Sequence, residues 1–154
     1  MVPPAIWIIS GLPGKRRREV AVALIEAFDR AAHIDGDALA ASIVSGNVLP
    51  GEEPPQESER QIELSVRNQC LLARSFAEAG FTPVIEYAVM TRDQLDAYRH
   101  YLAGGQIRLV VALGESDDSD AAALLRNELA GLGAWPENAD ATAIIKDQAS
   151  ASVS

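Results

Sequence analysis

Three consecutive arginines stand where a phosphate-binding loop would carry its most important residues. The segment Ile6–Val20 reads IWIISGLPGKRRREV, an apolar run followed by a glycine-containing turn and a stretch of cations. A loop that binds nucleotide phosphates has the spacing G-x-x-x-x-G-K-[S/T]: its glycines admit the phosphates to backbone N–H groups, its lysine contacts them, and its hydroxyl ligates Mg²⁺. Counted from Gly11, the second glycine falls on Arg16, the lysine on Arg17 and the hydroxyl on Arg18. The spacing is kept while the chemistry is changed.

Each of the three arginines replaces one residue by which such a loop binds the nucleotide or its metal. Arg17 keeps a positive charge, but its planar guanidinium does not reproduce a compact ammonium. Arg18 offers no ligand to a metal, and Arg16 puts a long side chain where the backbone has to approach a phosphate closely. We therefore expect weak or absent binding of ATP with Mg²⁺. The residues that would contact this cofactor are Gly11, Gly14, Lys15, Arg16, Arg17 and Arg18.

Cations in the first turn of a helix oppose the helix dipole, at a cost of about 0.3–1 kcal/mol each when exposed. Their presence predicts a compensating anion, which is either a ligand or a set of protein carboxylates. Asp35 and Asp37 follow the second predicted strand, and Glu86 ends the third. In a parallel sheet such strand ends meet at one edge. We therefore predict that Arg17 or Arg16 folds into the phosphate position and pairs with one of these acids.

The acids have alternative roles that the sequence leaves open. Asp37 has the position of a helix N-cap, and it is also a carboxylate that could accept a proton from a bound hydroxyl. Glu86 is either a metal ligand or an ordinary acid at the end of a strand. His33, which precedes the first acid, is interpreted as a packed or capping residue.

Alternating strand and helix patterns predict a single α/β domain over residues 1–147, with a frayed tail at 148–154. Its expected form is a three-layer α/β/α sandwich with a parallel sheet and right-handed crossovers. Thr91 is a predicted N-cap and Gly80 a predicted helix end. Strands are expected at 5–9, 33–35, 81–89, 107–113 and, as an edge, 141–147; helices are expected from 20, from 37 to 46, at 58–79, from 91, and at 116–133.

Charge and composition restrict the possible partners and compartment. The net charge of −9 argues against general binding to nucleic acid, which requires neutralisation of phosphates. No apolar run approaches the roughly 20 residues of a membrane span, and the N-terminus does not resemble an export signal. The single cysteine, Cys70, is expected to be buried in a helix and fits a reducing cytoplasm. We expect a cytoplasmic protein with a small-molecule or anionic ligand; its oligomeric state does not follow from the sequence.

Four stretches carry a resemblance to a known family: IWIISGLPG, HIDGDAL, RNQCLLARSFAEAGF and VMTRDQL. Their order and spacing over roughly residues 5 to 113 resemble the small P-loop kinases of the chloramphenicol phosphotransferase-like and AAA-type kinase group. This resemblance implies the P-loop NTPase fold of nucleoside and shikimate kinases. It also implies transfer of the γ-phosphate of ATP, with Mg²⁺, to the hydroxyl of a small molecule.

The resemblance also assigns roles to individual residues. It implies that Asp35 or Asp37 acts as the base toward the acceptor hydroxyl or holds the acceptor. Glu86 occupies the Walker B position, where the family usually has an aspartate for the metal. Arg67 and Arg92 are candidate residues of the acceptor pocket, with a surface role as the alternative.

The segment after the fourth strand departs from the family pattern, in which an arginine-bearing lid covers the triphosphate. Here the segment is acidic, and Arg126 is interpreted as a surface helix residue. The sequence therefore favours a kinase-like protein with a degraded nucleotide site. Two alternatives stay open: an active ATP-dependent phosphotransferase, and an anion-binding module built on Lys15–Arg18.

Overall fold

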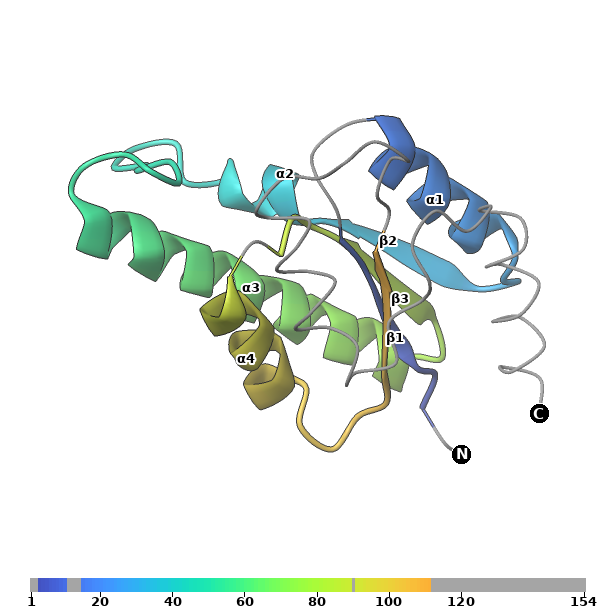
Figure 1. The fold of residues 1–154 in the computed structure, drawn as a ribbon. Helices are drawn as coiled ribbons and strands as arrows, with labels where there is room; N and C mark the ends of the chain where they lie inside the picture. Colours follow the sequence, from blue (N-terminus) through green and yellow to red (C-terminus); the bar gives the residue numbers. More distant parts are fainter. Residues whose placement is uncertain (1–2, 11–14, 90, 112–154) are drawn as a thin grey trace.

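The computed structural model describes residues 3–10, 15–89 and 91–111, and these form a parallel sheet covered by helices on both faces (Figure 1). The strands have the order β2-β3-β1-β4, and every neighbouring pair is parallel. The elements are β1 (Ile6–Ser10), α1 (Lys15–Glu26), β2 (Ala31–Asp35), α2 (Gly36–Ala40), α3 (Pro55–Glu78), β3 (Thr82–Glu86), α4 (Arg92–Tyr101) and β4 (Ile107–Val111). The predicted α/β sandwich is thereby confirmed.

The sandwich has two apolar layers because side chains of β1 alternate between the two faces of the sheet. Trp7 and Ile9 pack against Val20 and Leu24 of α1. Ile6 and Ile8 belong to the other layer, which α3 and α4 cover. Figure 1 shows α1 on one side of the strands and the α3–α4 pair on the other. The five residues of β1 are all buried, as expected for a strand covered on both faces.

Several boundaries differ from the sequence expectation. Helix α1 begins at Lys15, ahead of the apolar positions that recur from Val20, and the arginines lie in its first turn as expected. Helix α2 ends at Ala40 rather than near Gly46. Helix α3 starts earlier than predicted, at Pro55, because proline suits the first helical position, where its missing N–H is no loss. The strand predicted at 81–89 is shorter, and the one predicted at 33–35 is longer.

The predicted helix caps at α3 and α4 are confirmed. The Thr91 hydroxyl accepts a hydrogen bond from the N–H of Gln94, whose side chain in turn accepts from the N–H of Thr91. Gly80 follows α3 with φ of 87°, a left-handed conformation that glycine adopts without strain. The fifth strand at 141–147, the helix at 116–133 with Arg126 and the tail at 148–154 lie outside the described residues.

Cys70 is buried on α3, as predicted, and burial raises the pKa of its thiol to about 12 against a smaller opposing effect of the Arg74 charge. It is therefore a packing residue and not a thiolate nucleophile. Among the described residues, no helix has both the length and the apolar character needed to cross a membrane.

A buried chain of hydrogen bonds connects three helices beneath the end of β2. The Tyr98 hydroxyl donates to Gln69 Oε1, Gln69 Nε2 donates to Ser65 Oγ at 3.1 Å, and Ser65 Oγ donates to the carbonyl of Gly36 at 3.4 Å. Gly36 is itself buried against the ring of Tyr87. The chain holds the start of α2, and with it the acids on either side of Gly36, in a fixed place.

We predict that Gly36→Ala destabilises the protein by about 1–3 kcal/mol, the usual effect of overpacking. A Cβ at this position would lie 2.5 Å from Cδ1 of Tyr87 and 2.7 Å from Nε2 of Gln69. Urea unfolding would measure the change. Ala38→Ser, at an exposed position of the same helix, is the control and should stay within about 0.5 kcal/mol. Equal effects of the two substitutions would contradict the packing described here.

Candidate functional site

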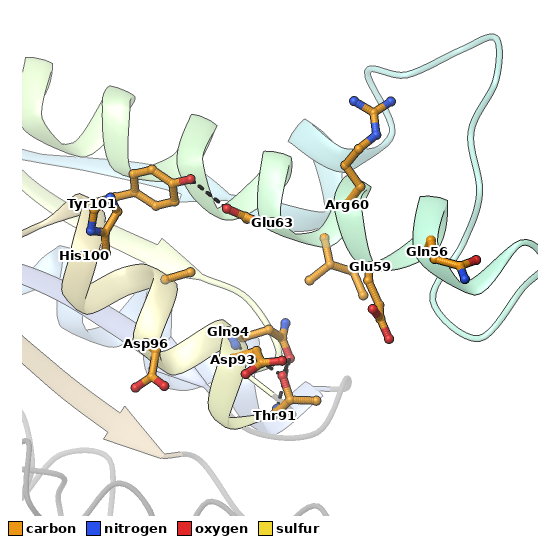
Figure 2. A pocket seen from close by; sticks show the side chains of 12 residues that line it. Gln56, Glu59, Arg60, Glu63, Thr91, Asp93, Gln94, Asp96, His100 and Tyr101 are labelled. Carbon is orange, nitrogen blue, oxygen red and sulfur yellow. Dashed lines mark hydrogen bonds between the residues drawn. The ribbon is translucent and has the colours of Figure 1, made fainter.

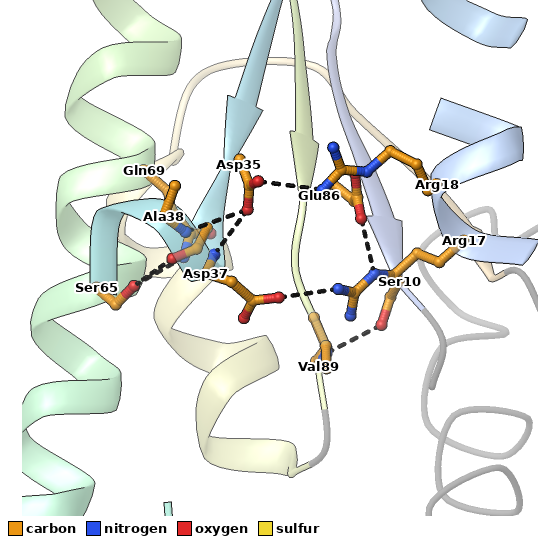
Figure 3. Close-up of polar contacts among 12 residues, drawn as sticks. Ser10, Arg17, Arg18, Asp35, Asp37, Ala38, Ser65, Gln69, Glu86 and Val89 are labelled. Atoms are coloured by element: carbon orange, nitrogen blue, oxygen red, sulfur yellow. Dashed lines mark hydrogen bonds and ion pairs between the residues drawn. The ribbon is translucent and has the colours of Figure 1, made fainter. Parts of the chain in front are cut away.

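Three strand ends and one helix start converge on a single polar site (Figure 3). Asp35 ends β2 and lies opposite Glu86, which ends β3, and Glu86 in turn lies opposite Ile9 of β1. The first turn of α1 brings Arg17 and Arg18 over this edge. We call Asp35, Asp37 and Glu86 the acid cluster. Its members come together because the carboxyl ends of parallel strands share one edge.

Arg17 lies inside the acid cluster and bridges two of its members. Its Nε donates to Oε2 of Glu86 at 3.1 Å, and its Nη2 donates to Oδ2 of Asp37 at 3.0 Å. Arg17 is 4% exposed and Glu86 is 2% exposed, so the contact between them is a buried ion pair. The predicted pairing of an arginine with these acids is confirmed for Arg17.

The second oxygen of Glu86 is also occupied. Arg18 Nε approaches Oε1 at 2.8 Å, and Nε2 of His33 lies 3.1 Å from the same oxygen. Arg18 reaches Asp35 as well, with Nη2 at 3.1 Å from Oδ2. Glu86 is thus surrounded by two guanidinium groups and one imidazole, which is how a buried carboxylate is compensated.

This arrangement does not fit a resident Mg²⁺. Both oxygens of Glu86 point at nitrogen groups, and Mg²⁺ requires free oxygen ligands in near-octahedral geometry. Arg18, at the position of the metal-binding hydroxyl, has no oxygen to offer. Within residues 3–10, 15–89 and 91–111, no group of three or more His, Cys, Asp or Glu side chains is placed to hold a metal.

Asp35, and not Asp37, caps helix α2, so the interpretation of Asp37 as an N-cap is wrong. Oδ1 of Asp35 accepts from the N–H groups of Asp37 at 3.0 Å and Ala38 at 3.2 Å. The chain turns into the helix one residue earlier than expected, because Gly36 is already helical. Asp37 is freed for Arg17, and its side chain remains 62% exposed.

The environment of Asp35 favours its charged form. Partial burial raises the pKa of this carboxyl, but the hydrogen bonds from Ala38, Arg18 and Asp37 and the positive charge of Arg18 outweigh it, and the pKa lies below its ordinary value of 3.8. The same carboxylate therefore caps α2 and anchors Arg18.

The cationic first turn of α1 is now explained by charges within the protein. The charges of Arg17 and Arg18 are each met by two carboxylates of the acid cluster, which offsets their unfavourable position at the helix N-terminus. One guanidinium nitrogen, Nη1 of Arg17, is buried and has no hydrogen-bond partner among the residues that the structure describes.

The remaining predicted site residues contribute less. Gly11 and Gly14 lie outside the described residues, and for Lys15, Arg16 and Arg92 only the helical backbone is described. Arg67 is exposed on α3, and the pKa of Tyr101 on α4 is raised mainly by the hydrogen bond to Glu63, against a smaller opposite effect of the Arg67 charge.

Sequence reasoning undervalued two residues that the structure places at the site. Nε2 of His33 lies within hydrogen-bond distance of Glu86. Ser10 is fully buried, and its Oγ accepts a hydrogen bond of 3.0 Å from the N–H of Val89. The available signal was position: both stand at or near the end of a strand whose neighbours carry the acids.

No protein-family model matches this sequence, and no curated protein matches it either. Solved structures do match, at low sequence identity. A sugar kinase from Janibacter sp. aligns over 96% of this chain and 94% of its own, with 15% identity and a TM-score of 0.62. The APS kinase of Mycobacterium tuberculosis, in complex with AMPPNP and APS, aligns over 98% and 96%, with 14% identity and a TM-score of 0.62.

The tunicamycin resistance protein of Deinococcus radiodurans aligns over 98% of this chain and 95% of its own, with 15% identity and a TM-score of 0.60. At such identities the likeness concerns the fold. The chain has the fold of the P-loop kinases, as the resemblance in its sequence implied.

We predict that Arg17→Met lowers the free energy of unfolding by about 3–5 kcal/mol, because it leaves a buried carboxylate without its partner. The double variant Arg17→Met/Glu86→Gln should recover part of this loss, since the orphaned charge is gone. Chemical denaturation of both variants measures the effect. The control is Arg60→Met, which removes an exposed arginine paired with Glu57 and should change stability far less. A loss no larger than that of the control would contradict the buried pair.

We predict that the stability advantage of the wild type over Asp35→Asn depends on pH. Asparagine also caps helices, so the substitution removes mainly the ion pair with Arg18. Because the pKa of Asp35 is lowered in the folded state, its contribution is fully present above its unfolded pKa of about 4 and is lost as pH falls through the folded value. Denaturation curves from neutral pH to about pH 3 test this. A difference that stays constant over the range would refute it.

Proposed function

We propose that this protein is a P-loop-kinase-like protein that has lost ordinary Mg·ATP phosphotransfer and acts as a non-catalytic module. The observation that carries the proposal is the buried ion pair between Arg17 and Glu86. Phosphoryl transfer on this fold needs a lysine on the phosphates and a metal held by a hydroxyl and an acid. Here the side chain at the lysine position is directed to the acid at the metal position, so the two are bound to each other.

The energy of this pair opposes nucleotide binding. To contact a phosphate, Arg17 would have to leave Glu86 and Asp37, and the carboxylate of Glu86 would remain buried with less compensation. Breaking a buried pair on one side costs about 3–5 kcal/mol. Such a cost weakens a dissociation constant by roughly two to three and a half orders of magnitude.

The alternative of an active phosphotransferase draws support from Asp37. Its carboxylate is largely exposed at the strand end and is available to a hydroxyl group. In that case Asp35 and Asp37 would serve the acceptor, Glu86 the metal, and Arg67 and Arg92 the substrate. The cofactor would be ATP with Mg²⁺, in keeping with an APS kinase of the same fold that is known with AMPPNP.

A third possibility is an anion-binding module that works without Mg²⁺. Nη1 of Arg17 favours it, because this buried nitrogen has no partner among the described residues and could donate to an oxyanion. Such binding would depend strongly on salt and not at all on the metal.

Calorimetry with ATP, with and without Mg²⁺, tests these alternatives. We expect the wild type to show no Mg²⁺-dependent binding, and the variant Arg16→Gly/Arg17→Lys/Arg18→Ser to gain it, because this variant restores all three devices of the loop. The matched control is the same triple variant with Glu86→Gln added, which lacks the acid at the metal position and should bind more weakly.

Mg²⁺-dependent binding of ATP by the wild type would disprove the loss of the site and direct attention to an acceptor hydroxyl. Binding of inorganic phosphate without Mg²⁺, weakened by salt, would favour the anion module. If neither protein binds ATP, the loss extends beyond the three arginines.

A further inference from the structure

A second hollow lies between α3 and α4, and it shares no residue with the acid cluster or its arginines. Its volume is about 610 Å³, within the range of about 300–1,000 Å³ typical of sites for small molecules. Side chains from the N-terminal half of α3 form one wall, and α4 forms the other (Figure 2). We call it the α3–α4 groove.

Carboxylates line both walls of the α3–α4 groove: Glu59 and Glu63 on α3, and Asp93 and Asp96 on α4. Oε1 of Glu63 accepts the hydroxyl of Tyr101 at 3.0 Å, and Asp96 pairs with Arg99 at 3.6 Å.

The other two carboxylates, of Glu59 and Asp93, have no hydrogen-bond or ion-pair partner within the part of the chain that the structure describes. Each wall of the groove therefore keeps at least one negative charge that no cation of the described residues pairs with.

The one arginine of the lining does not cancel these charges. Arg60 donates two hydrogen bonds of 2.8 Å to Glu57 on its own helix, and its guanidinium points away from α4 in Figure 2. Its hydrogen bonds, followed by that from Gln61, lower the pKa of Glu57 to about 2. The positive charge of Arg60 is thus already committed outside the groove.

Other residues that line the α3–α4 groove differ in chemistry from its acids. Ile62 and Ala97 contribute apolar atoms, and the rings of His100 and Tyr101 lie edge to face with centroids 5.0 Å apart. Alkyl chains pack against apolar surface, and an aromatic face attracts an ammonium group. The lining therefore matches a ligand with an aliphatic body and charged amines.

The distribution of the acids argues against a metal ion as the occupant. Among the described residues, no three His, Cys, Asp or Glu side chains are close enough to share one ion. Charges spread along two walls are instead neutralised by a ligand that carries several positive charges along its length.

We propose that the α3–α4 groove binds a linear aliphatic polyamine, with its ammonium groups near Glu59 and Asp93 and its methylene chain against the apolar side chains of the lining. This inference is independent of the proposed function, because the groove and the acid cluster have no residue in common.

Titration calorimetry with spermidine at low salt tests the proposal on the full chain. We expect saturable binding at one site, weakened at least about tenfold in Glu59→Gln/Asp93→Asn. The matched control is Glu26→Gln/Glu78→Gln, which removes the same number of charges at exposed positions outside the groove and should bind as the wild type does. Amide chemical shifts of Ile62 and Ala97 should move on titration in the wild type and not in the groove variant.

Four results would overturn the proposal: no saturable binding, equal weakening in the groove and control variants, displacement of spermidine by Mg²⁺ at equal charge concentration, or tighter binding of a lysine-rich peptide than of spermidine. The second and third would indicate screening of the net negative charge, and the fourth a protein segment as the occupant. Thermal unfolding of each variant checks that all of them are folded.

Discussion

The ion pair between Arg17 and Glu86 is the interaction on which the polar edge of the sheet depends. Glu86 is buried at the end of a central strand, and a charge in such a place has to be met by an opposite charge and by hydrogen bonds. Arg17 supplies both from the first turn of α1. Apolar packing of Val20 and Leu24 sets α1 on the sheet, and the ion pair fixes where the first turn of that helix meets the acid cluster.

The contact also reconciles two unfavourable features that would each be costly alone. A buried carboxylate is destabilising without a cation, and cations at the start of a helix are destabilising against its dipole. When the two groups pair, the cation compensates the buried carboxylate, and the carboxylate compensates the cation at the start of the helix. Asp35 likewise serves two purposes. Its carboxylate accepts hydrogen bonds from two backbone N–H groups at the start of α2 and also pairs with Arg18.

Much of this could be predicted from the sequence, because the relevant signals are local or topological. The apolar run of β1, the capping box at Thr91 and the glycine after α3 are short-range patterns that predict their own structure. The pairing of Arg17 with the acid cluster followed from the helix dipole and from the shared edge of parallel strands.

Other features depend on details that no spacing reveals. Which aspartate caps α2 depends on where the helix begins. Gly36, which packs on Tyr87, is already helical, so the residue before it, Asp35, is the cap. The α3–α4 groove is formed by two segments that are distant in the sequence, 56–63 and 91–101, and its acids are ordinary surface residues in the sequence. His33 became relevant only in the folded chain, where it stands opposite Val84 in the sheet and its side chain reaches Glu86, two residues further along β3.

The mutual dependence of Arg17 and Glu86 has a consequence for how such a site can change over generations. A single replacement at either position passes through a protein with an unmatched buried charge, which is less stable than both the starting and the final form. Replacement of the pair by a lysine and a free acid would require several substitutions that arise close together, or a background stable enough to tolerate the intermediate. The arginine form is therefore persistent once it is established, whatever ligand the protein binds.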